Sequence, residues 1–269
     1  MSDLLRFVQH CNKDLINGSG QGIEEARQYL LKDRNLLEKG WECHTIGYCR
    51  NDFDIPDPIR YYGTAHKVVD ERWDITRHIR GRIIVPIFSE FGDVVAFATR
   101  KPTTEPGHPW WNLPNPFQKG NHLFLLDKAR KEIYKKNKVY IVEGYVDGLV
   151  LFEQGLKNVV AVMGTAYTLR KIGLTARYSN NVCLCFDSDP NESGTKAKRM
   201  STATLSKYSF CESISTIDTL PISEDPASFV GKEGIVRFLE MERVMDDEEI
   251  ARICLEVAKG NSGRLLDAK

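Results

Sequence analysis

The second half of the chain alternates short apolar runs with patterns of helical spacing. The apolar runs have the length of buried strands and lie at 139–143, 158–162, 181–186 and about 213–219. The helical patterns separate and follow them, at about 148–154, 168–177, 194–207 and 233–243. A βαβ series of this kind predicts an α/β fold with a parallel, doubly wound sheet.

The two ends of the chain have mainly helical patterns. The N-terminal region predicts two helices, separated by a glycine-rich break at 17–22, with the second helix at 23–32. Residues 41–75 are rich in aromatic and turn-forming residues and predict irregular structure. The tail, 246–269, begins with four acidic residues that suit a helix N-terminus, and Gly260 predicts its end.

A β-hairpin is predicted in the middle of the chain. Two apolar runs, 82–88 and 94–100, flank a turn that contains Gly92. Residues 102–120 then form a proline-rich loop that carries Trp110 and Trp111. Exposed tryptophans can stack on unpaired bases, although such residues more often anchor a loop against the core.

Acidic residues follow two of the predicted strands. Glu143 ends the first strand, Gly144 permits a tight turn, and Asp147 lies where the next helix would begin. Asp187 and Asp189 follow the third strand. If these strands are parallel neighbours, the four carboxylates meet at the carboxyl edge of the sheet, where open α/β sheets bind ligands. Carboxylates this close repel one another unless a cation lies between them, and all-oxygen ligands suit Mg²⁺ or Mn²⁺.

Charge is unevenly distributed, although the chain has 37 basic and 37 acidic residues. Residues 60–142 hold 15 basic and 8 acidic side chains, whereas residues 143–269 hold 15 and 19. A basic region beside an acidic metal centre is typical of enzymes that act on polyanions, although a solvated charged surface is the alternative. Four basic residues bracket the hairpin: Arg80, Arg82, Arg100 and Lys101.

The cysteines and the apolar segments indicate an intracellular protein. None of the seven cysteines forms a Cys-x-x-Cys pair, so reduced thiols are expected. Cys183 and Cys185 have strand spacing and are interpreted as small core residues. No membrane-spanning stretch or signal peptide is recognised in the sequence, and we expect no membrane partner and a cytoplasmic location.

Three segments in this order resemble the motifs of a Toprim domain: Glu143 to Asp147, Ala161 to Thr165, and Asp187 to Asp189. The hairpin strand that begins at Arg82 and the segment that begins at Lys119 are similar to the basic subdomain that precedes Toprim in bacterial replicative primases of the DnaG type. The resemblance extends from about residue 23 to about residue 243.

This resemblance implies a domain organisation. A mixed α/β basic subdomain is expected at 1–137, a Toprim-type parallel sheet flanked by helices at 138–232, and a short helical segment at 233–269. The zinc-binding and helicase-binding domains of these primases are not recognised in the sequence, so template recognition is expected to need another chain or to be relaxed.

The resemblance also implies roles for single residues. Glu143, Asp187 and Asp189 are the expected metal ligands, Asp225 completes the set, and Asp147 supports the site. The expected contacts to template or nucleotide phosphates are Arg80, Arg82, Arg100 and Lys119, with Gly164 and Thr165 forming the loop beside the nucleotide.

Three positions depart from the family pattern. The acidic loop after Asp189 is about two residues longer, which can change the metal spacing. Ala227 stands where the family has a second aspartate, and Trp110 replaces a lysine of the loop before Lys119, so nucleotide handling can differ.

The function that this pattern implies is synthesis of short RNA primers on single-stranded DNA. The expected substrates are ribonucleoside triphosphates with Mg²⁺ or Mn²⁺, and the expected partner is a separate replicative helicase in a bacterial or phage-infected cytoplasm. A Toprim nuclease, or a non-catalytic nucleic-acid-binding accessory protein, is the alternative. The basic hairpin favours a primase over a nuclease, and the full carboxylate set argues against an accessory protein.

Overall fold

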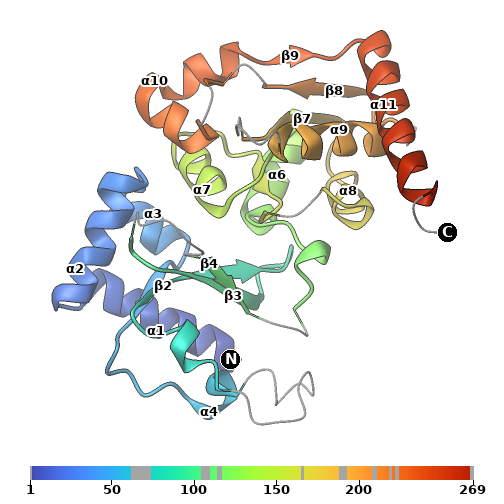
Figure 1. Cartoon of the computed structure of the whole chain (residues 1–269). Helices are drawn as coiled ribbons and strands as arrows, with labels where there is room; N and C mark the ends of the chain where they lie inside the picture. The colour runs from blue at the N-terminus through green and yellow to red at the C-terminus, as the bar shows by residue number, and fades with distance from the viewer. Residues whose placement is uncertain are drawn as a thin grey trace. The chain divides into compact units, whose positions relative to one another are not determined.

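The chain forms two compact units, Met1–Gln118 and Lys119–Lys269 (Figure 1). The computed structural model describes residues 2–61, 74–103, 110–113, 117–164, 167–187, 193–207, 211–217, 220–221 and 224–266. Across these residues no helix is both long and apolar enough to cross a membrane.

The first unit contains a four-stranded antiparallel sheet with the order β1-β2-β3-β4. The strands are β1 (Gly47–Cys49), β2 (Arg82–Phe88), β3 (Val94–Arg100) and β4 (Trp110–Asn112). β2 and β3 pair in the predicted hairpin, with Val85 opposite Ala98. β4 lies within the region that was predicted to be a loop, and its pairing with β3 is the contact that makes it a strand.

The helices of the first unit are α1 (Asp3–Asn17), α2 (Gln21–Gln28), α3 (Glu38–Cys43) and α4 (Asp57–Arg60). A π-helical turn, Tyr29–Asp33, follows α2, and a 3₁₀ turn spans Thr76–His78. α1 packs against β1, β2 and β3 through a stripe of helical spacing that includes Phe7, Cys11 and Leu15. The predicted break between α1 and α2 is confirmed. The prediction of irregular structure at 41–75 is wrong for β1 and α4, because tertiary pairing and packing create these short elements.

The second unit contains a five-stranded sheet with the order β6-β5-β7-β8-β9 (Figure 1). The strands are β5 (Val139–Val142), β6 (Val159–Ala161), β7 (Asn181–Cys185), β8 (Ser213–Thr216) and β9 (Arg243–Val244). The first four are parallel, as predicted, and β9 adds an antiparallel edge. Cys183 and Cys185 are completely buried in β7, which confirms them as core residues.

Helices flank this sheet (Figure 1). They are α6 (Leu126–Lys136), α7 (Tyr145–Glu153), α8 (Leu169–Thr175), α9 (Ser193–Leu205), α10 (Pro226–Glu240) and α11 (Asp247–Leu266). α7 packs with α10, and α9 packs with α11. α11 continues to Leu266, so the predicted end at Gly260 is wrong: a glycine weakens a helix but ends it only in a suitable capping conformation.

The domain limits predicted at residues 137 and 232 stay predictions. The structure places α6, which precedes the first of these limits, in the second unit, where it packs against β6.

The amino edge of the second sheet is held by a half-buried carboxylate. Glu242 accepts hydrogen bonds from the Tyr140 hydroxyl (2.7 Å) and the Ser215 hydroxyl (2.6 Å) and pairs with Lys138. Burial raises the pKa of Glu242, but these donors outweigh it and lower the pKa below its usual value. The network therefore joins the turn before β9 to β5 and β8.

A substitution at Gly47 tests the packing of α1 against β1 in the first unit. A Cβ at this position would lie 2.4 Å from the Cys11 carbonyl carbon and 2.6 Å from the Asn12 nitrogen, both in the backbone of α1. We expect Gly47→Ala to lower the free energy of unfolding by roughly 3 kcal/mol, because α1 must move from β1. Gly173→Ala, at an open and exposed helical position, is the matched control and should raise it by about 0.5–1 kcal/mol. Denaturant unfolding followed by circular dichroism measures both, and equal stability of the two variants would contradict the packing.

Candidate functional site

Glu143 and Asp187 meet at the carboxyl edge of the second sheet. β5 and β7 are parallel neighbours, with Val142 opposite Cys185, so the residues that follow them leave the sheet at the same edge. The backbone N–H of Asp187 donates a hydrogen bond to Oε1 of Glu143 at 3.3 Å. Asp189 lies outside the described residues.

Asp147 lies in the first turn of α7 and is 5% exposed. Its Oδ2 accepts from the Gly144 N–H (3.1 Å), and its Oδ1 accepts from the Ala227 N–H (3.2 Å). Burial raises the pKa of Asp147 to about 7, with further contributions from the negative charges of Asp225 and Glu143, while the two backbone donors oppose the rise. Asp147 therefore links the starts of α7 and α10 within the field of two other carboxylates.

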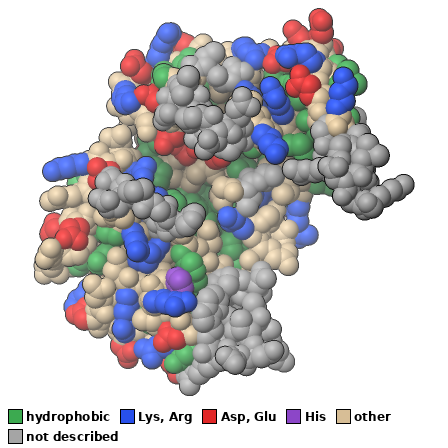
Figure 2. Space-filling view, viewed as in Figure 1, with side chains coloured by type: hydrophobic (Ala, Val, Ile, Leu, Met, Phe, Trp, Pro, Cys, Tyr) green, Lys and Arg blue, Asp and Glu red, His purple; other side chains and the backbone are tan. Residues whose placement is uncertain are grey.

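Asp225 is the N-cap of α10, and its Oδ1 accepts from the Ser228 N–H at 2.6 Å. The charge interaction with Asp147 places Asp225 in the same acidic group. Figure 2 shows acidic side chains close together on part of the visible face of this unit.

The carboxylates at this edge have the donor chemistry that small divalent cations prefer. Their side chains offer only oxygen donors, and the negative charges of Asp225 and Glu143 add to burial in raising the pKa of Asp147, an effect that a bound cation would oppose. Gly194 approaches these residues so closely that a side chain would not fit. A Cβ there would lie 2.1 Å from the Asp187 carbonyl oxygen and 2.9 Å from Oε1 of Glu143. The start of α9 can approach this edge because residue 194 has no side chain.

Gly164 and Lys119 also belong to the second unit. The Gly164 N–H donates to the Glu143 carbonyl oxygen at 2.9 Å, and its φ of 69° favours glycine. Lys119 begins a 3₁₀ turn, Lys119–Asn121, and burial lowers its pKa. Thr165 lies outside the described residues.

Two of the predicted basic residues are buried in the first unit. Arg82 donates from Nε to the Thr99 hydroxyl at 2.7 Å. The guanidinium of Arg100 lies over the rings of Tyr29 (5.2 Å) and Trp110 (5.1 Å) and donates to the Tyr29 hydroxyl. Trp111 stacks on His78, with 4.8 Å between ring centroids. Both tryptophans therefore contact neighbouring side chains of the first unit.

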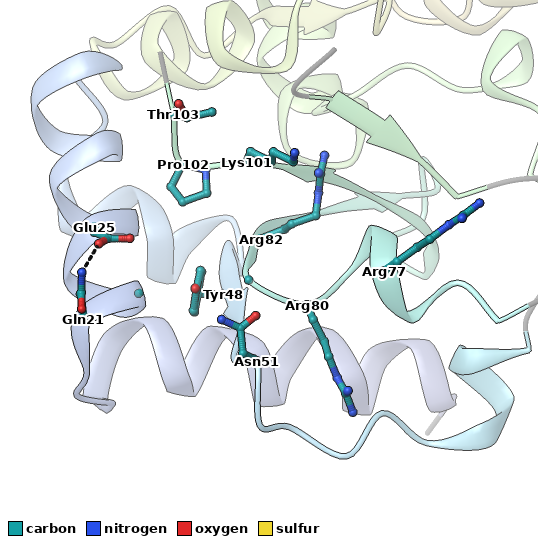
Figure 3. A pocket seen from close by; sticks show the side chains of 12 residues that line it. Gln21, Glu25, Tyr48, Asn51, Arg77, Arg80, Arg82, Lys101, Pro102 and Thr103 are labelled. Carbon is teal, nitrogen blue, oxygen red and sulfur yellow. Dashed lines mark hydrogen bonds between the residues drawn. The ribbon is translucent and has the colours of Figure 1, made fainter. Parts of the chain in front are cut away.

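A pocket of about 580 Å³ opens in the first unit (Figure 3). Tyr48 and Asn51 lie in its lining, and Gln21 and Glu25 are hydrogen-bonded to each other at 2.8 Å on another wall. Arg100 is not among the lining residues. The basic residues that line the pocket are Arg77, Arg80, Arg82 and Lys101.

Strand pairing explains part of this basic lining. Ile83 lies opposite Arg100, so Arg82 and Lys101 come from facing positions at one end of the hairpin. Arg80 precedes β2 and donates to the Phe53 carbonyl oxygen at 3.0 Å. Tyr48, Asn51 and Arg77 were not predicted as site residues, because no local sequence pattern indicates that they share a pocket.

Comparison with known protein families finds a matching domain model for each unit. Residues 14–130 match the model of the DNA primase catalytic core, N-terminal domain, and residues 137–209 match the Toprim domain. The chain belongs to the DnaG-type primase family. Toprim primases are metal-dependent, which agrees with the carboxylate oxygens at the carboxyl edge of the second sheet.

Among DnaG-type relatives, a DNA primase of Thermotoga maritima is 35% identical over 78% of this chain. The chain spans 38% of the length of that relative. The solved structure of a DnaG catalytic core is 27% identical, covers 88% of this chain and 77% of its own, and has a TM-score of 0.72. A DnaG primase catalytic domain bound to ssDNA shares the fold, with 24% identity, a TM-score of 0.67, and coverage of 88% of this chain and 81% of its own.

A substitution at Gly194 tests whether a cation binds at the carboxyl edge, and it leaves every carboxylate in place. We expect Gly194→Ala to weaken Mn²⁺ binding at least tenfold, because the new Cβ must displace the Asp187 backbone or the Glu143 carboxylate. Electron paramagnetic resonance of free Mn²⁺ measures the affinity, and Gly173→Ala is the control. A Gly194→Ala variant with unchanged fold and unchanged Mn²⁺ affinity would show that the cation does not bind here.

Proposed function

We propose that this chain is the catalytic core of a DNA primase that joins ribonucleoside triphosphates into short RNA primers on single-stranded DNA. The observation that carries the proposal is the meeting of Glu143 and Asp187 at the ends of adjacent parallel strands in a Toprim unit. The proposed ion is Mg²⁺ or Mn²⁺, because the donors are all oxygen.

In this proposal Glu143, Asp187, Asp189 and Asp225 hold the metal ions. Bound divalent ions would activate the attacking 3′ oxygen and neutralise the charge of the leaving pyrophosphate. Asp147 positions the site, because its hydrogen bonds fix the backbone at Gly144 and Ala227. The cap at Asp225 fixes that carboxylate relative to α10.

The basic pocket of the first unit is the proposed contact for phosphates of the template strand. Arg77, Arg80, Arg82 and Lys101 give it positive charge, and its size suits a few backbone groups rather than a duplex. Lys119 and Gly164, with Thr165, are the proposed nucleotide side of the second unit. The phosphate contact expected of Arg100 stays a prediction, as do the helicase partner and the cytoplasmic location.

Primer synthesis tests the proposal directly. The protein is incubated with single-stranded DNA and labelled ribonucleotides, with Mg²⁺ or with Mn²⁺. We expect short labelled products that fall by at least a hundredfold in Glu143→Gln, because one metal ligand loses its charge. Glu153→Gln, on the last turn of α7, is the matched control and should retain activity.

Two other outcomes would reject the proposal. Metal-dependent shortening of the DNA without ribonucleotide incorporation would identify a Toprim nuclease, and DNA binding without metal-dependent chemistry would identify an accessory protein.

Template binding tests the basic pocket. We expect Arg77→Ala and Lys101→Ala each to weaken binding of a single-stranded oligonucleotide a few-fold. Each should also reduce the slope of log affinity against log salt by about 0.7, the value for one phosphate contact on a single strand. Lys13→Ala, on the exposed side of α1, should change neither quantity. Fluorescence anisotropy between 50 and about 200 mM salt provides the measurement, and pocket variants with the salt slope of Lys13→Ala would place the template elsewhere.

A further inference from the structure

Lys171 is a completely buried lysine on α8. Its Nζ donates a hydrogen bond to the Val162 carbonyl oxygen at 2.7 Å. An ammonium group removed from water is costly, and lysine is seldom fully buried without a partner or a function. None of the roles proposed above uses this residue.

Lys171 belongs to a basic cluster formed by Lys119, His122, Arg170 and Lys171. The charge of Lys119 acts on Lys171, and the charges of Arg170 and Lys171 act on His122. Thr168 joins the two segments, because its hydroxyl donates to the Gly120 carbonyl oxygen at 3.0 Å. In a protein without an anion at this place, such a cluster is self-repelling.

The cluster is linked to the carboxylate edge through the loop that follows β6. The Val162 N–H donates to the Val142 carbonyl oxygen at 2.9 Å, and the Gly164 N–H donates to the Glu143 carbonyl oxygen at 2.9 Å. The carbonyl group that Lys171 holds therefore belongs to a loop bonded to the end of β5. This loop carries Gly164, one of the proposed nucleotide contacts.

We propose that Lys171 is a positioning residue: its ammonium group holds the loop at 162–164 so that the basic cluster can bind the polyphosphate of a nucleoside triphosphate. This inference rests on the proposed function and adds a residue to it. The ammonium acts in two ways, since its hydrogen bond fixes the loop and its positive charge attracts the anion. A neutral amine would form a weaker hydrogen bond to the Val162 carbonyl oxygen and would not attract the anion.

The protonation of Lys171 gives the inference a pH dependence. Burial, followed by the charge of Lys119, lowers the pKa of Lys171 to about 7. The charge that acts on it is that of Lys119, which lies in the 3₁₀ turn at 119–121. The pKa of His122 is also lowered, by burial and by the charges of Arg170 and Lys171. As the pH rises from 6.5 to 8.5, Lys171 loses its proton and the affinity for polyphosphate should fall.

Calorimetric binding of inorganic tripolyphosphate in the presence of EDTA tests this without the metal site. For the wild-type chain we expect roughly tenfold weaker binding at pH 8.5 than at pH 6.5, a change typical of coupling between two sites. Lys171→Arg keeps its charge at both pH values and should bind equally well at both, apart from the protonation of the probe. Lys171→Met should bind weakly at both. Lys135→Met, an exposed lysine of α6, should behave as the wild type.

The comparison separates the two proposals. The probe titrates identically for every variant, so the difference between wild type and Lys171→Arg isolates Lys171 even if Lys171→Met fails to fold. Equal pH dependence of wild type and Lys171→Arg overturns the inference. If wild type and Lys171→Arg show equal pH dependence but the protein still synthesises primers, only the Lys171 inference is rejected. If the expected binding pattern is found without primer synthesis, the polyphosphate site stands and the primase proposal is rejected.

Discussion

The parallel pairing of β5 with β7 is the constraint on which the second unit depends. It places the residues after Val142 and after Cys185 at one edge, and a shift of register by one residue would separate the side chains that follow. The turn at Gly144 then sends the chain into α7, where Asp147 contacts the start of α10. One strand pairing thus fixes the carboxylates and also the two helices that support them.

The pKa values of two carboxylates at opposite ends of this sheet are shifted in opposite directions. At the amino edge, Glu242 has hydrogen-bond donors from a lysine, a tyrosine and a serine, and its pKa is lowered. At the carboxyl edge, Asp147 is buried among acidic neighbours and its pKa is raised. The first arrangement stabilises the fold. In the second, like charges repel one another, and a bound cation would reduce this repulsion. This contrast distinguishes a carboxylate that stabilises the fold from one that lies beside the proposed metal ligands.

Much of the second unit could be predicted because its signals are local. The strands that precede Glu143 and Asp187 are short apolar runs, and the turn residues after them are adjacent in the sequence. Lys171 was missed although the sequence carried a signal: it lies four residues before Thr175, so both belong to one face of α8. The pocket that contains Tyr48 and Arg77 could not be predicted in this way. Its walls come from segments far apart in the chain, and tertiary structure, including the pairing of β1 with β2, brings them together.

The packing of Arg100 limits which residues can replace it. Its flat guanidinium lies against Tyr29, from the π-helical turn, and against Trp110, from β4, so it joins an irregular helical segment to the last strand of the sheet. A lysine would preserve the net charge of the chain, yet its tetrahedral ammonium cannot offer two planar faces to aromatic neighbours. Shape, rather than charge, is therefore what makes arginine difficult to exchange at this position.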